Sequence, residues 1–403
     1  MKLSLFTPTH DPKYLAELYQ TIKKQKHKDW EWVICPNSKK GTPLPALPAE
    51  ITADSRVVVV PLLHEGKPNI GQLKRFCCTK ATGDVLIEMD HDDLLVPAAL
   101  TKINQAAEAG GEFIYSDVGC FRDDTERTSG GYDPRWGWEN YEFAYYGRPT
   151  IATRNFEITP ASLCQVFYAP DHVRCWRRDK YFEIGGHNPS LLICDDHDLI
   201  CRSYIAGLNF QHVGGCVYLY RRHDNNTVKL YSEEIKGQTA ANCRLHLHKL
   251  IDAWLKHTGY AYHDLETRPI LWVGGKPRID ADDNTVGCVK AYGNTLPLIP
   301  HEHITSLFNE VYRVLVPGGY FSVDFPTTDS AAGFAPHFKS FWNNRTLSHY
   351  TNKELAAGMP DHNCRFQSIQ AFLHHKDADK NHVCCRADLS ALKGQRQPGR
   401  VFI

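Results

Sequence analysis

The sequence predicts an α/β protein that is built from two domains. Short, continuous apolar runs alternate with segments whose apolar residues recur at helical spacing, as in a sheet covered by helices. The run from Val85 to Met89 is the clearest of the predicted buried strands. A chain of 403 residues is long enough for two domains, and its character changes from about Leu265 onward. We therefore expect a larger domain over residues 1–262 and a smaller α/β domain over residues 263–403.

The first half of the larger domain is predicted to run strand, helix, strand, strand, helix, strand. The four strands are predicted at Leu3–Thr7, Trp30–Cys35, Arg56–Leu63 and Val85–Met89. Pro8 and Pro36 are expected to end the first two strands, because proline has no backbone N–H group to donate. Asp11 is expected to cap the first helix at Pro12, and Asn69 to open the second. This alternation indicates a largely parallel sheet.

Three carboxylates, Asp90, Asp92 and Asp93, directly follow the strand that ends at Met89. Ligand sites of α/β proteins lie at the carboxyl ends of their strands, so these side chains are expected to project into a crevice. Carboxylates are the preferred ligands of Mg²⁺ or Mn²⁺ bound together with phosphate groups. From this motif alone, a solvated acidic turn before the helix near Val96 is the slightly better interpretation. The motifs in the rest of the chain favour the metal-binding interpretation instead.

Composition excludes several classes of protein. Lys and Arg together number 46, as do Asp and Glu, so the formal net charge is zero. Net charge therefore gives no signal for nucleic-acid or membrane binding, although a local patch remains possible. None of the 14 cysteines forms a CxxC pair, so zinc-ribbon and thioredoxin-type sites are not expected. With no signal peptide or membrane span predicted, we expect a cytoplasmic protein with free thiols.

Motifs in the first 230–260 residues resemble family 2 glycosyltransferases of the GT-A fold. The segments "WEWVICPNS", "NIGQLKRFCCTKATGD" and "VLIEMDHDDLLVP" follow the first strand and its Pro-Thr-His end in the order of that family. The resemblance implies a Rossmann-like mixed sheet and a D-x-D element, Asp90 and Asp92, which holds a divalent metal on the diphosphate of a nucleotide sugar. The family commonly has an Asp pair after its second strand. This chain has Cys35-Pro36-Asn37 there, so the identity of the nucleotide stays open.

The same resemblance implies positions that contact the donor and the acceptor. The implied donor-binding residues are Thr7, Pro8, His10, Asn37, Gln72, Arg75, Asp90, His91 and Arg178. Arg178 opens an "R-x-x-x-x-x-I-G-G" segment that ends at Gly185 and Gly186, on the acceptor side in the family. Trp138 belongs to an aromatic cluster that suits a sugar-binding cleft. Filling a hydrophobic core explains that cluster at least as well.

An acidic segment, Cys194-Asp195-Asp196-His197-Asp198, resembles the "E-D-x-D" element of the family. Inverting transfer needs a carboxylate that takes the proton of the acceptor hydroxyl, and Asp196 occupies that place with Asp195 beside it. Two neighbouring carboxylates near a metal are expected to have separated pKa values. Further on, "YRRHDNN" resembles the element in which a histidine completes the metal shell. His223 is therefore a candidate metal ligand, with an ordinary loop histidine as a serious alternative.

The C-terminal third resembles a different family. "NEVYRVLVPGGYFSVDFP" resembles the second half of class I methyltransferases. Those enzymes hold S-adenosylmethionine with a glycine-rich turn and an acid after two earlier strands. The segment between Leu265 and Pro300 is too short to supply both with their helices. We therefore expect a reduced, non-catalytic methyltransferase-like module that is structural or binds the acceptor.

Together these features predict a metal-dependent inverting glycosyltransferase. Its expected cofactors are Mn²⁺ or Mg²⁺ and a nucleotide-sugar donor, with a UDP-sugar as the first candidate. The expected acceptor is a hydroxyl group on a glycan or on a hydroxymethylated DNA base. Two alternatives remain open: a bifunctional enzyme that also methylates, and a non-catalytic protein that binds sugar nucleotides or glycans. The presence of Asp90, Asp92 and Asp196 argues against the last of these.

Overall fold

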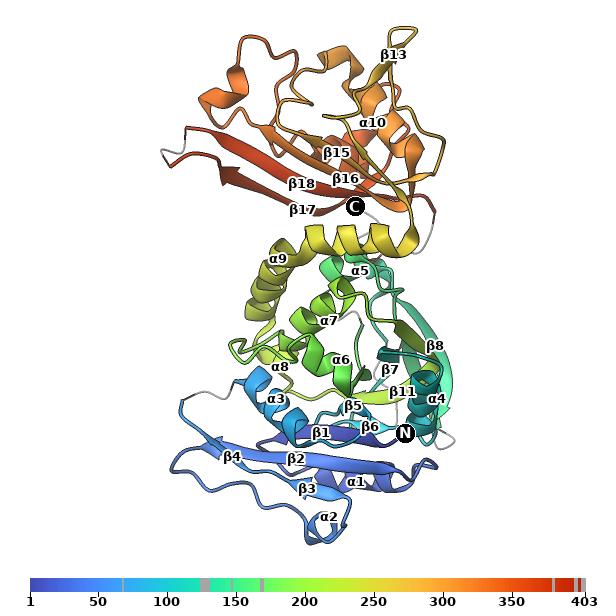
Figure 1. The fold of residues 1–403 in the computed structure, drawn as a ribbon, viewed down its shortest axis with the longest axis vertical. Coiled ribbons are helices and arrows are strands. Elements are labelled where there is room, and N and C mark those ends of the chain that lie inside the picture. The colour runs from blue at the N-terminus through green and yellow to red at the C-terminus, as the bar shows by residue number, and fades with distance from the viewer. Residues whose placement is uncertain are drawn as a thin grey trace. The chain divides into compact units, whose positions relative to one another are not determined.

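A computed structural model describes residues 1–66, 69–123, 131–145, 148–166, 170–378, 381–394 and 398–399. The chain divides into two compact units (Figure 1). Unit 1 comprises Met1–Pro134 and Trp138–Leu250, and unit 2 comprises Arg135–Gly137 and the chain from Ile251 onward. The division falls within the long helix α9 (Ser232–Thr258). Within the described residues, no helix combines the length and the hydropathy needed to cross a membrane.

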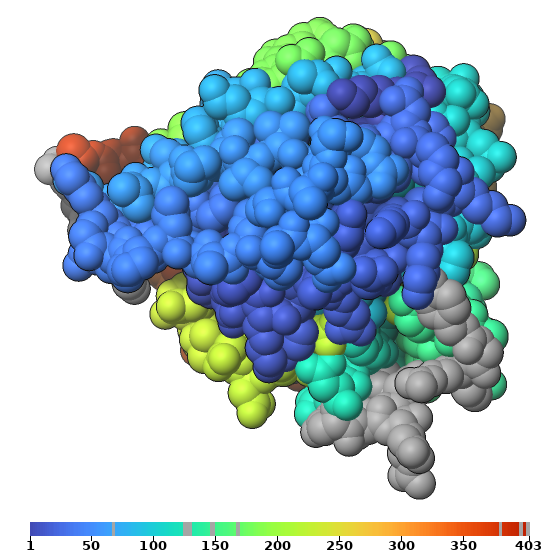
Figure 2. Space-filling model, turned by 90° about the horizontal axis from the view of Figure 1, so that it is seen from below, coloured from blue at the N-terminus to red at the C-terminus, as the bar shows by residue number. Residues whose placement is uncertain are grey.

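Unit 1 is built on one mixed sheet with the strand order β3-β2-β1-β5-β10-β7-β11-β6. The strands are β1 (Leu3–Thr9), β2 (Trp30–Lys39), β3 (Val57–Val59), β4 (Leu62–His64), β5 (Val85–Glu88), β6 (Leu94–Leu95), β7 (Phe113–Phe121), β8 (Glu139–Tyr145), β9 (Arg148–Arg154), β10 (Arg174–Arg177) and β11 (Phe210–Arg221). The first four strands of this order run parallel, and β10 is antiparallel to both of its neighbours. The segment that carries β1 to β4, in blue, fills most of the face of unit 1 seen in Figure 2.

Helices cover both faces of this sheet. The helices from Leu15 to Thr258 are α1 (Leu15–Lys23), α2 (Ala49–Thr52), α3 (Ile70–Lys80), α4 (Ala99–Glu108), α5 (Pro160–Gln165), α6 (Arg178–Glu183), α7 (Asp195–Ile205), α8 (Thr227–Leu230) and α9, with a 3₁₀ turn at Pro134–Trp136. One hydrophobic cluster includes buried residues of α1 and α4, and another includes residues of α3 and α7. Each cluster also holds strand residues, so the sheet separates two cores.

Two predicted strand ends were wrong, because β1 and β2 continue through Pro8 and Pro36. The last residue of β1 paired with β5 is Phe6, so no partner strand lies beside Pro8 on that side. Pro36 falls in the gap between the residues that pair with β3 and those that pair with β4. At both places the missing N–H group leaves the hydrogen-bond ladder intact, because a proline is tolerated where no partner needs it.

The start of the first helix also differs from the prediction. Helix α1 begins at Leu15 after Tyr14, and not at Pro12. The Asp11 carboxylate accepts a hydrogen bond from the backbone N–H of Lys13 at 2.9 Å. It therefore closes a local turn instead of capping the helix, an alternative that aspartate offers readily.

A buried carboxylate ties the start of the sheet together. The Glu31 side chain on β2 is 6% exposed and accepts hydrogen bonds from the Ser4 hydroxyl and from the backbone and hydroxyl of Thr82. The Lys2 ammonium lies 2.6 Å from it. Burial alone would raise the pKa of Glu31, but these contacts lower it to about 2. Glu31 thus links β1, β2 and the turn before β5.

Unit 2 holds a second, five-stranded sheet with the order β12-β15-β16-β18-β17. Its elements are β12 (Ala261–Asp264), β13 (Leu271–Val273), β14 (Lys276–Arg278), β15 (Val286–Tyr292), α10 (Ile304–Val314), β16 (Leu315–Pro326), α11 (Ser348–Thr351), α12 (Lys353–Ala356), β17 (Phe366–His375) and β18 (Val383–Ala391), with 3₁₀ turns at His301–His303 and Ala331–Phe334. Strands β12, β15 and β16 run parallel, whereas β18 is antiparallel to β16 and β17. Strands β13 and β14 form a separate hairpin.

The two faces of the unit 2 sheet differ in polarity. One face packs on α10 and forms an apolar core with Phe308, Phe321 and Cys385. The other face carries polar side chains such as Ser322, Asp324 and Asp388, all of which are buried. Adjacent cysteines on β18 show the alternation, since Cys385 faces the core and its neighbour Cys384 faces the polar side.

Candidate functional site

The acidic loop after β5 is held by backbone and side-chain contacts from three strands. The Thr7 hydroxyl on β1 donates to the Met89 carbonyl and accepts from the Trp32 indole, both at 2.8 Å. The fully buried Asp93 accepts from the Tyr218 hydroxyl at 2.8 Å and from the Arg221 N–H at 2.7 Å. Burial raises the pKa of Asp93 well above its usual value. Asp93 therefore anchors the loop, which leaves Asp90 and Asp92 as its accessible carboxylates.

Asp92 lies beside the predicted metal-binding histidine. The Asp92 carboxylate is 2.8 Å from Nε2 of His223, and the two side chains are 14% and 26% exposed. The buried Arg221 guanidinium donates to the Asp92 backbone carbonyl, so the backbone here is fixed independently of the carboxylate. The His223 ring stacks on that of Tyr14, and the backbone N–H of His223 donates to the side-chain oxygen of Asn226. An aspartate oxygen and an imidazole nitrogen that converge at this spacing fit the donor set of a divalent cation.

Asp90 belongs to a chain of contacts that reaches the predicted base. Its carboxylate lies 3.3 Å from Nε2 of His172, and that nitrogen lies 2.7 Å from the Arg174 guanidinium on β10. Arg174 reaches Asp196 at 2.8 Å through its other terminal nitrogen. Burial would raise the pKa of Asp90, but the hydrogen bond and charge of His172 lower it to about 2. The two predicted functional carboxylates are therefore joined through His172 and Arg174.

Beneath this chain lies a buried cluster of charged groups. Glu88 on β5 is 1% exposed and contacts Lys74 and Arg174, each at 2.8 Å. His187, which is fully buried, lies 3.6 Å from Glu88 and 3.7 Å from Asp195. Burial alone would raise the pKa of Glu88, but Arg174 and Lys74 hold it well below its usual value. These ion pairs compensate charged groups that are buried away from water.

The environments of the two neighbouring aspartates differ. The Asp195 side chain is 3% exposed and faces inward, with the Lys74 ammonium 3.5 Å away. Burial raises the pKa of Asp195. The Asp196 side chain is 25% exposed, and despite its burial the charges of Arg174 and Lys74 lower its pKa. Asp196 is thus the ionised, accessible member of the pair, and Asp195 is the packed one.

A glycine allows α3 and α7 to approach each other at this site. A Cβ atom added at Gly71 would lie 2.2 Å from the Asn188 carbonyl oxygen and 3.2 Å from Cβ of Asp195. The first distance is far below any normal contact. Gly71 therefore sets the closeness at which Asp195, and with it Asp196, sits against the helix that carries Lys74.

The remaining donor-side residues occupy varied positions. His10 is exposed after β1, and its ring makes an edge contact with that of His91 at 5.2 Å. The buried Asn37 amide donates to the Thr9 carbonyl at 2.9 Å. Gln72 is exposed and Arg75 is half-buried, and both lie on α3. His10 and Asn37 lie at the carboxyl ends of β1 and β2, and Gln72 and Arg75 lie near the start of α3.

Three sequence-based assignments need correction. Arg178 lies at the far end of β5 from Asp90, because its N–H donates to Asp84 and its guanidinium to Ala81, so it is separated from the donor-side residues. Thr7 and Pro8 are buried within the sheet, where the Thr7 hydroxyl holds the acidic loop through its hydrogen bond to the Met89 carbonyl. Trp138 is 2% exposed and packs on Tyr132 and Phe156, so it contributes to a core instead of a cleft wall.

The predicted acceptor-side glycines follow α6. Gly185 and Gly186 have φ values of +88° and +63°, a region that favours glycine. The Gly186 carbonyl accepts from Arg202, a residue of α7, at 2.8 Å. The glycines thus turn the chain from α6 toward the segment that precedes Asp195.

Sequence reasoning missed four members of the site: Lys74, Glu88, His172 and His187. Glu88 offered a signal, because it is the one carboxylate within the apolar run Val85–Met89. A charged group in a buried strand needs a partner, so it predicts a cation nearby. Arg174 is the cation that the structure pairs with Glu88, and it also pairs with Asp196.

Comparison with known proteins points to one family for this region. Residues 4–168 match the model of glycosyl transferase family 2. The chain is 24% identical over 221 residues to the O-antigen biosynthesis protein RfbC of Myxococcus xanthus, and 26% identical over 139 residues to the uncharacterized protein y4gI of Sinorhizobium fredii. These alignments cover 54% and 33% of the chain. The chain spans 15% of the length of each of these two relatives.

Solved structures similar to this chain include TarS and PcManGT. TarS of S. aureus matches with a TM-score of 0.42 and 13% identity, over 63% of this chain and 44% of TarS. The mannosyltransferase PcManGT of Pyrobaculum calidifontis matches with a TM-score of 0.38 and 14% identity, over 64% of this chain and 76% of the other. The region similar to glycosyl transferase family 2, residues 4–168, contains β1 to β9 and the acidic loop with Asp90 and Asp92.

Proposed function

We propose that unit 1 transfers a sugar from a nucleotide-sugar donor to a hydroxyl group of an acceptor, with inversion at the anomeric carbon. The observation that carries this proposal is the chain of contacts from Asp90 through His172 and Arg174 to Asp196. Because only two side chains separate Asp90 from Asp196, this chain supports a metal-binding role for the first carboxylate and a proton-transfer role for the second.

Asp90, Asp92 and His223 are the residues that would hold a divalent cation, Mn²⁺ or Mg²⁺. The 2.8 Å approach of Asp92 and His223 supports this assignment, as does the partial exposure of Asp90. A bound cation supplies positive charge that offsets the charge of the leaving diphosphate. Arg221 and Asp93 keep the loop in place for this role through contacts to its backbone and to β11.

In the proposed reaction, the Asp196 carboxylate takes the proton of the acceptor hydroxyl. The acceptor oxygen forms a bond to the anomeric carbon while the bond from that carbon to the phosphate oxygen breaks. The electron pair of the broken bond leaves with the nucleoside diphosphate. Burial would raise the pKa of Asp196, but the charges of Arg174 and Lys74 lower it, so this carboxylate is ionised at neutral pH and not already protonated.

The donor and acceptor are proposed by class. UDP-sugars are our first candidates for the donor, and a glycan or a hydroxymethylated DNA base for the acceptor. The test is incubation of the full chain with a panel of UDP-, GDP- and TDP-sugars in the presence of Mn²⁺ or Mg²⁺. We expect slow, metal-dependent hydrolysis of one donor, in which water replaces the acceptor. Absence of turnover with every donor and acceptor in the panel would favour the alternative, a protein that binds sugar nucleotides without turnover.

For unit 2 we propose a reduced methyltransferase-like module without S-adenosylmethionine binding. Three parallel strands followed by an antiparallel pair, with the last strand inserted beside β16, support the likeness. Between β12 and β15, the β13–β14 hairpin is the only regular secondary structure, and all residues of that segment are described. A glycine-rich cofactor turn with its following helix has no place there, which supports a structural or acceptor-binding role.

A further inference from the structure

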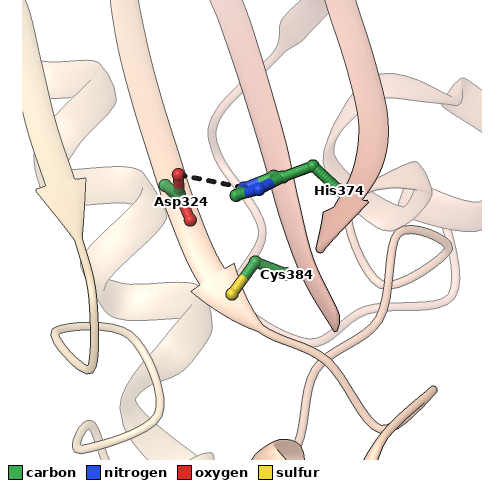
Figure 3. A group of neighbouring side chains, drawn as sticks. All are labelled: Asp324, His374 and Cys384. Atoms are coloured by element: carbon green, nitrogen blue, oxygen red, sulfur yellow. Dashed lines mark hydrogen bonds and ion pairs between the residues drawn. The ribbon is translucent and has the colours of Figure 1, made fainter. Parts of the chain in front are cut away.

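Three side chains with metal-ligating atoms meet on the polar face of the unit 2 sheet: Asp324 on β16, Cys384 on β18 and His374 on β17 (Figure 3). The strand register explains the meeting. His374 is paired directly with Cys384, and Cys384 is paired with Pro326, two residues from Asp324. Directly paired residues, and residues two apart on one strand, share a face of a sheet. Three neighbouring strands thus each contribute one ligand type to the same place.

The spacing of the three groups is close to that of a metal site. One ligand atom from each residue lies within 4.8 Å of the other two, and Nε2 of His374 is 3.2 Å from the Asp324 carboxylate. Zinc holds nitrogen and oxygen ligands at about 2.0–2.2 Å and sulfur at about 2.3 Å in a tetrahedron, so its ligands lie roughly 3–4 Å apart. Small side-chain rotations therefore suffice to bring all three onto one ion.

One oxygen at this place lacks a hydrogen bond. Asp324 is 8% exposed, and its Oδ1 is buried without a hydrogen-bond partner among the described residues. A buried carboxylate oxygen normally has such a partner, because removal from water is otherwise costly. Cys384 is fully buried, although it lies on the polar face of the sheet. A carboxylate oxygen and a thiol that are both shielded from water are suited to a shared cation.

Two basic side chains lie near the Asp324 carboxylate and partly neutralise its charge. The Arg386 guanidinium lies 3.4 Å from Oδ2 of Asp324, donates to the Tyr292 hydroxyl and stacks 4.0 Å from its ring centre, so it is held in place. The Lys376 ammonium lies 3.8 Å from Oδ1 of Asp324, and its side chain is 42% exposed. Lys376 is thus a weakly held competitor that can move into solvent when a cation binds.

We propose that Asp324, His374 and Cys384 bind one Zn²⁺ ion in unit 2, with a fourth position open to water. Binding releases the thiol proton of Cys384 to solvent, and the thiolate becomes a ligand. The set of one oxygen, one nitrogen and one sulfur ligand is typical of zinc and unlike the oxygen-rich sets of Mg²⁺ and Ca²⁺. The ion joins β16, β18 and β17, so it is expected to stabilise this part of the sheet against unfolding.

The test uses the chelator-treated full chain titrated with Co²⁺, which occupies zinc sites and reports its ligands by absorbance. We expect one equivalent to produce strong visible bands of a tetrahedral ion together with a near-ultraviolet thiolate band, and one equivalent of Zn²⁺ to remove both. The thiolate band separates this site from the one proposed in unit 1, which contains no cysteine. His374→Ala and Cys384→Ser should each remove the thiolate band. His375→Ala, at the exposed next position on β17, should leave it unchanged.

A second variant tests the competition directly. Lys376→Gln removes the ammonium near Asp324, so it should tighten Zn²⁺ binding several-fold and increase the rise in melting temperature that Zn²⁺ causes. Because His374 is 30% exposed, His374→Ala is expected to fold, and its melting temperature should not respond to Zn²⁺. No thiolate band in the wild type, or an equal band in Cys384→Ser, would overturn the proposal. So would a Zn²⁺ affinity that is unchanged in both Lys376→Gln and His374→Ala.

Discussion

Replacement of Asp196 by Asn is the sharpest test of the proposed reaction. In the structure the Arg174 guanidinium lies 2.8 Å from the Asp196 carboxylate. The amide of the variant keeps an oxygen that can accept this hydrogen bond, so the local packing should persist. It cannot take a proton from the acceptor. Loss of a general base costs about 10²–10⁴ in rate, which corresponds to about 2.7–5.5 kcal/mol in the barrier. The donor dissociation constant should change little, because Asp196 is assigned no contact with the donor.

Asp195→Asn provides the matched control, because it makes the same chemical change one residue earlier. The Asp195 side chain is almost fully buried beside Lys74 and His187. Breaking a buried charge pair typically costs about 3–5 kcal/mol of stability. We therefore expect Asp195→Asn to lower the melting temperature clearly, and to lower the rate less than Asp196→Asn at a temperature where both variants are folded.

The assay measures donor hydrolysis and transfer under single-donor saturation, with melting curves recorded on the same preparations. We expect a large rate loss with a small stability loss for Asp196→Asn. For Asp195→Asn we expect a large stability loss with a smaller rate loss. If Asp195→Asn abolishes turnover in a folded protein while Asp196→Asn retains it, the assignment of the base within the pair is wrong.

Three further results are expected. Asp92→Ala, or removal of divalent cations by chelator, should abolish donor turnover without unfolding the protein, since Arg221 holds the loop through the backbone; full turnover in either case would contradict the metal assignment. Calorimetry of the full chain with S-adenosylmethionine should show no binding, and a micromolar isotherm, about −8 kcal/mol, would instead support a bifunctional enzyme. Glu31→Gln should cost about 2–3 kcal/mol in urea unfolding at pH 7. Because the folded-state pKa of Glu31 is about 2, below its ordinary 4.5, the wild-type advantage should be complete above pH 4.5 and vanish as the pH falls to about 2; a difference that does not depend on pH would refute this.

The order of the elements in unit 1 could be predicted because apolar runs and helical spacing are local signals. The strand from Val85 and the helix from Asn69 lie where the sequence placed them. The ends of β1 and β2 could not be predicted, since the effect of a proline depends on whether a partner strand lies beside it. That is a property of the assembled sheet, and Pro8 and Pro36 both lie where a partner is missing.

The candidate site was predicted where its residues stand in motifs and missed where they come together only in the fold. Asp92 and His223 are 131 positions apart and in contact, and both belong to recognisable segments. His172 and His187 are in no such segment, and they become significant only through their contacts with Asp90 and Asp195. Conversely, Arg178 stands in a motif but follows β10 at the end remote from Asp90, because β10 runs antiparallel to β5.

Gly71 implies a particular outcome in a survey of all single substitutions scored for activity. Even alanine at this position would force the Asn188 carbonyl away and move the start of α7, because the added carbon has no free space. Position 71 should therefore be as intolerant of substitution as Asp196, although glycine has no side chain that could touch a substrate. A reader of such a map would class it with the catalytic positions. The distinction would appear only in folding measurements, where Gly71→Ala should lower stability clearly and Asp196→Asn only slightly.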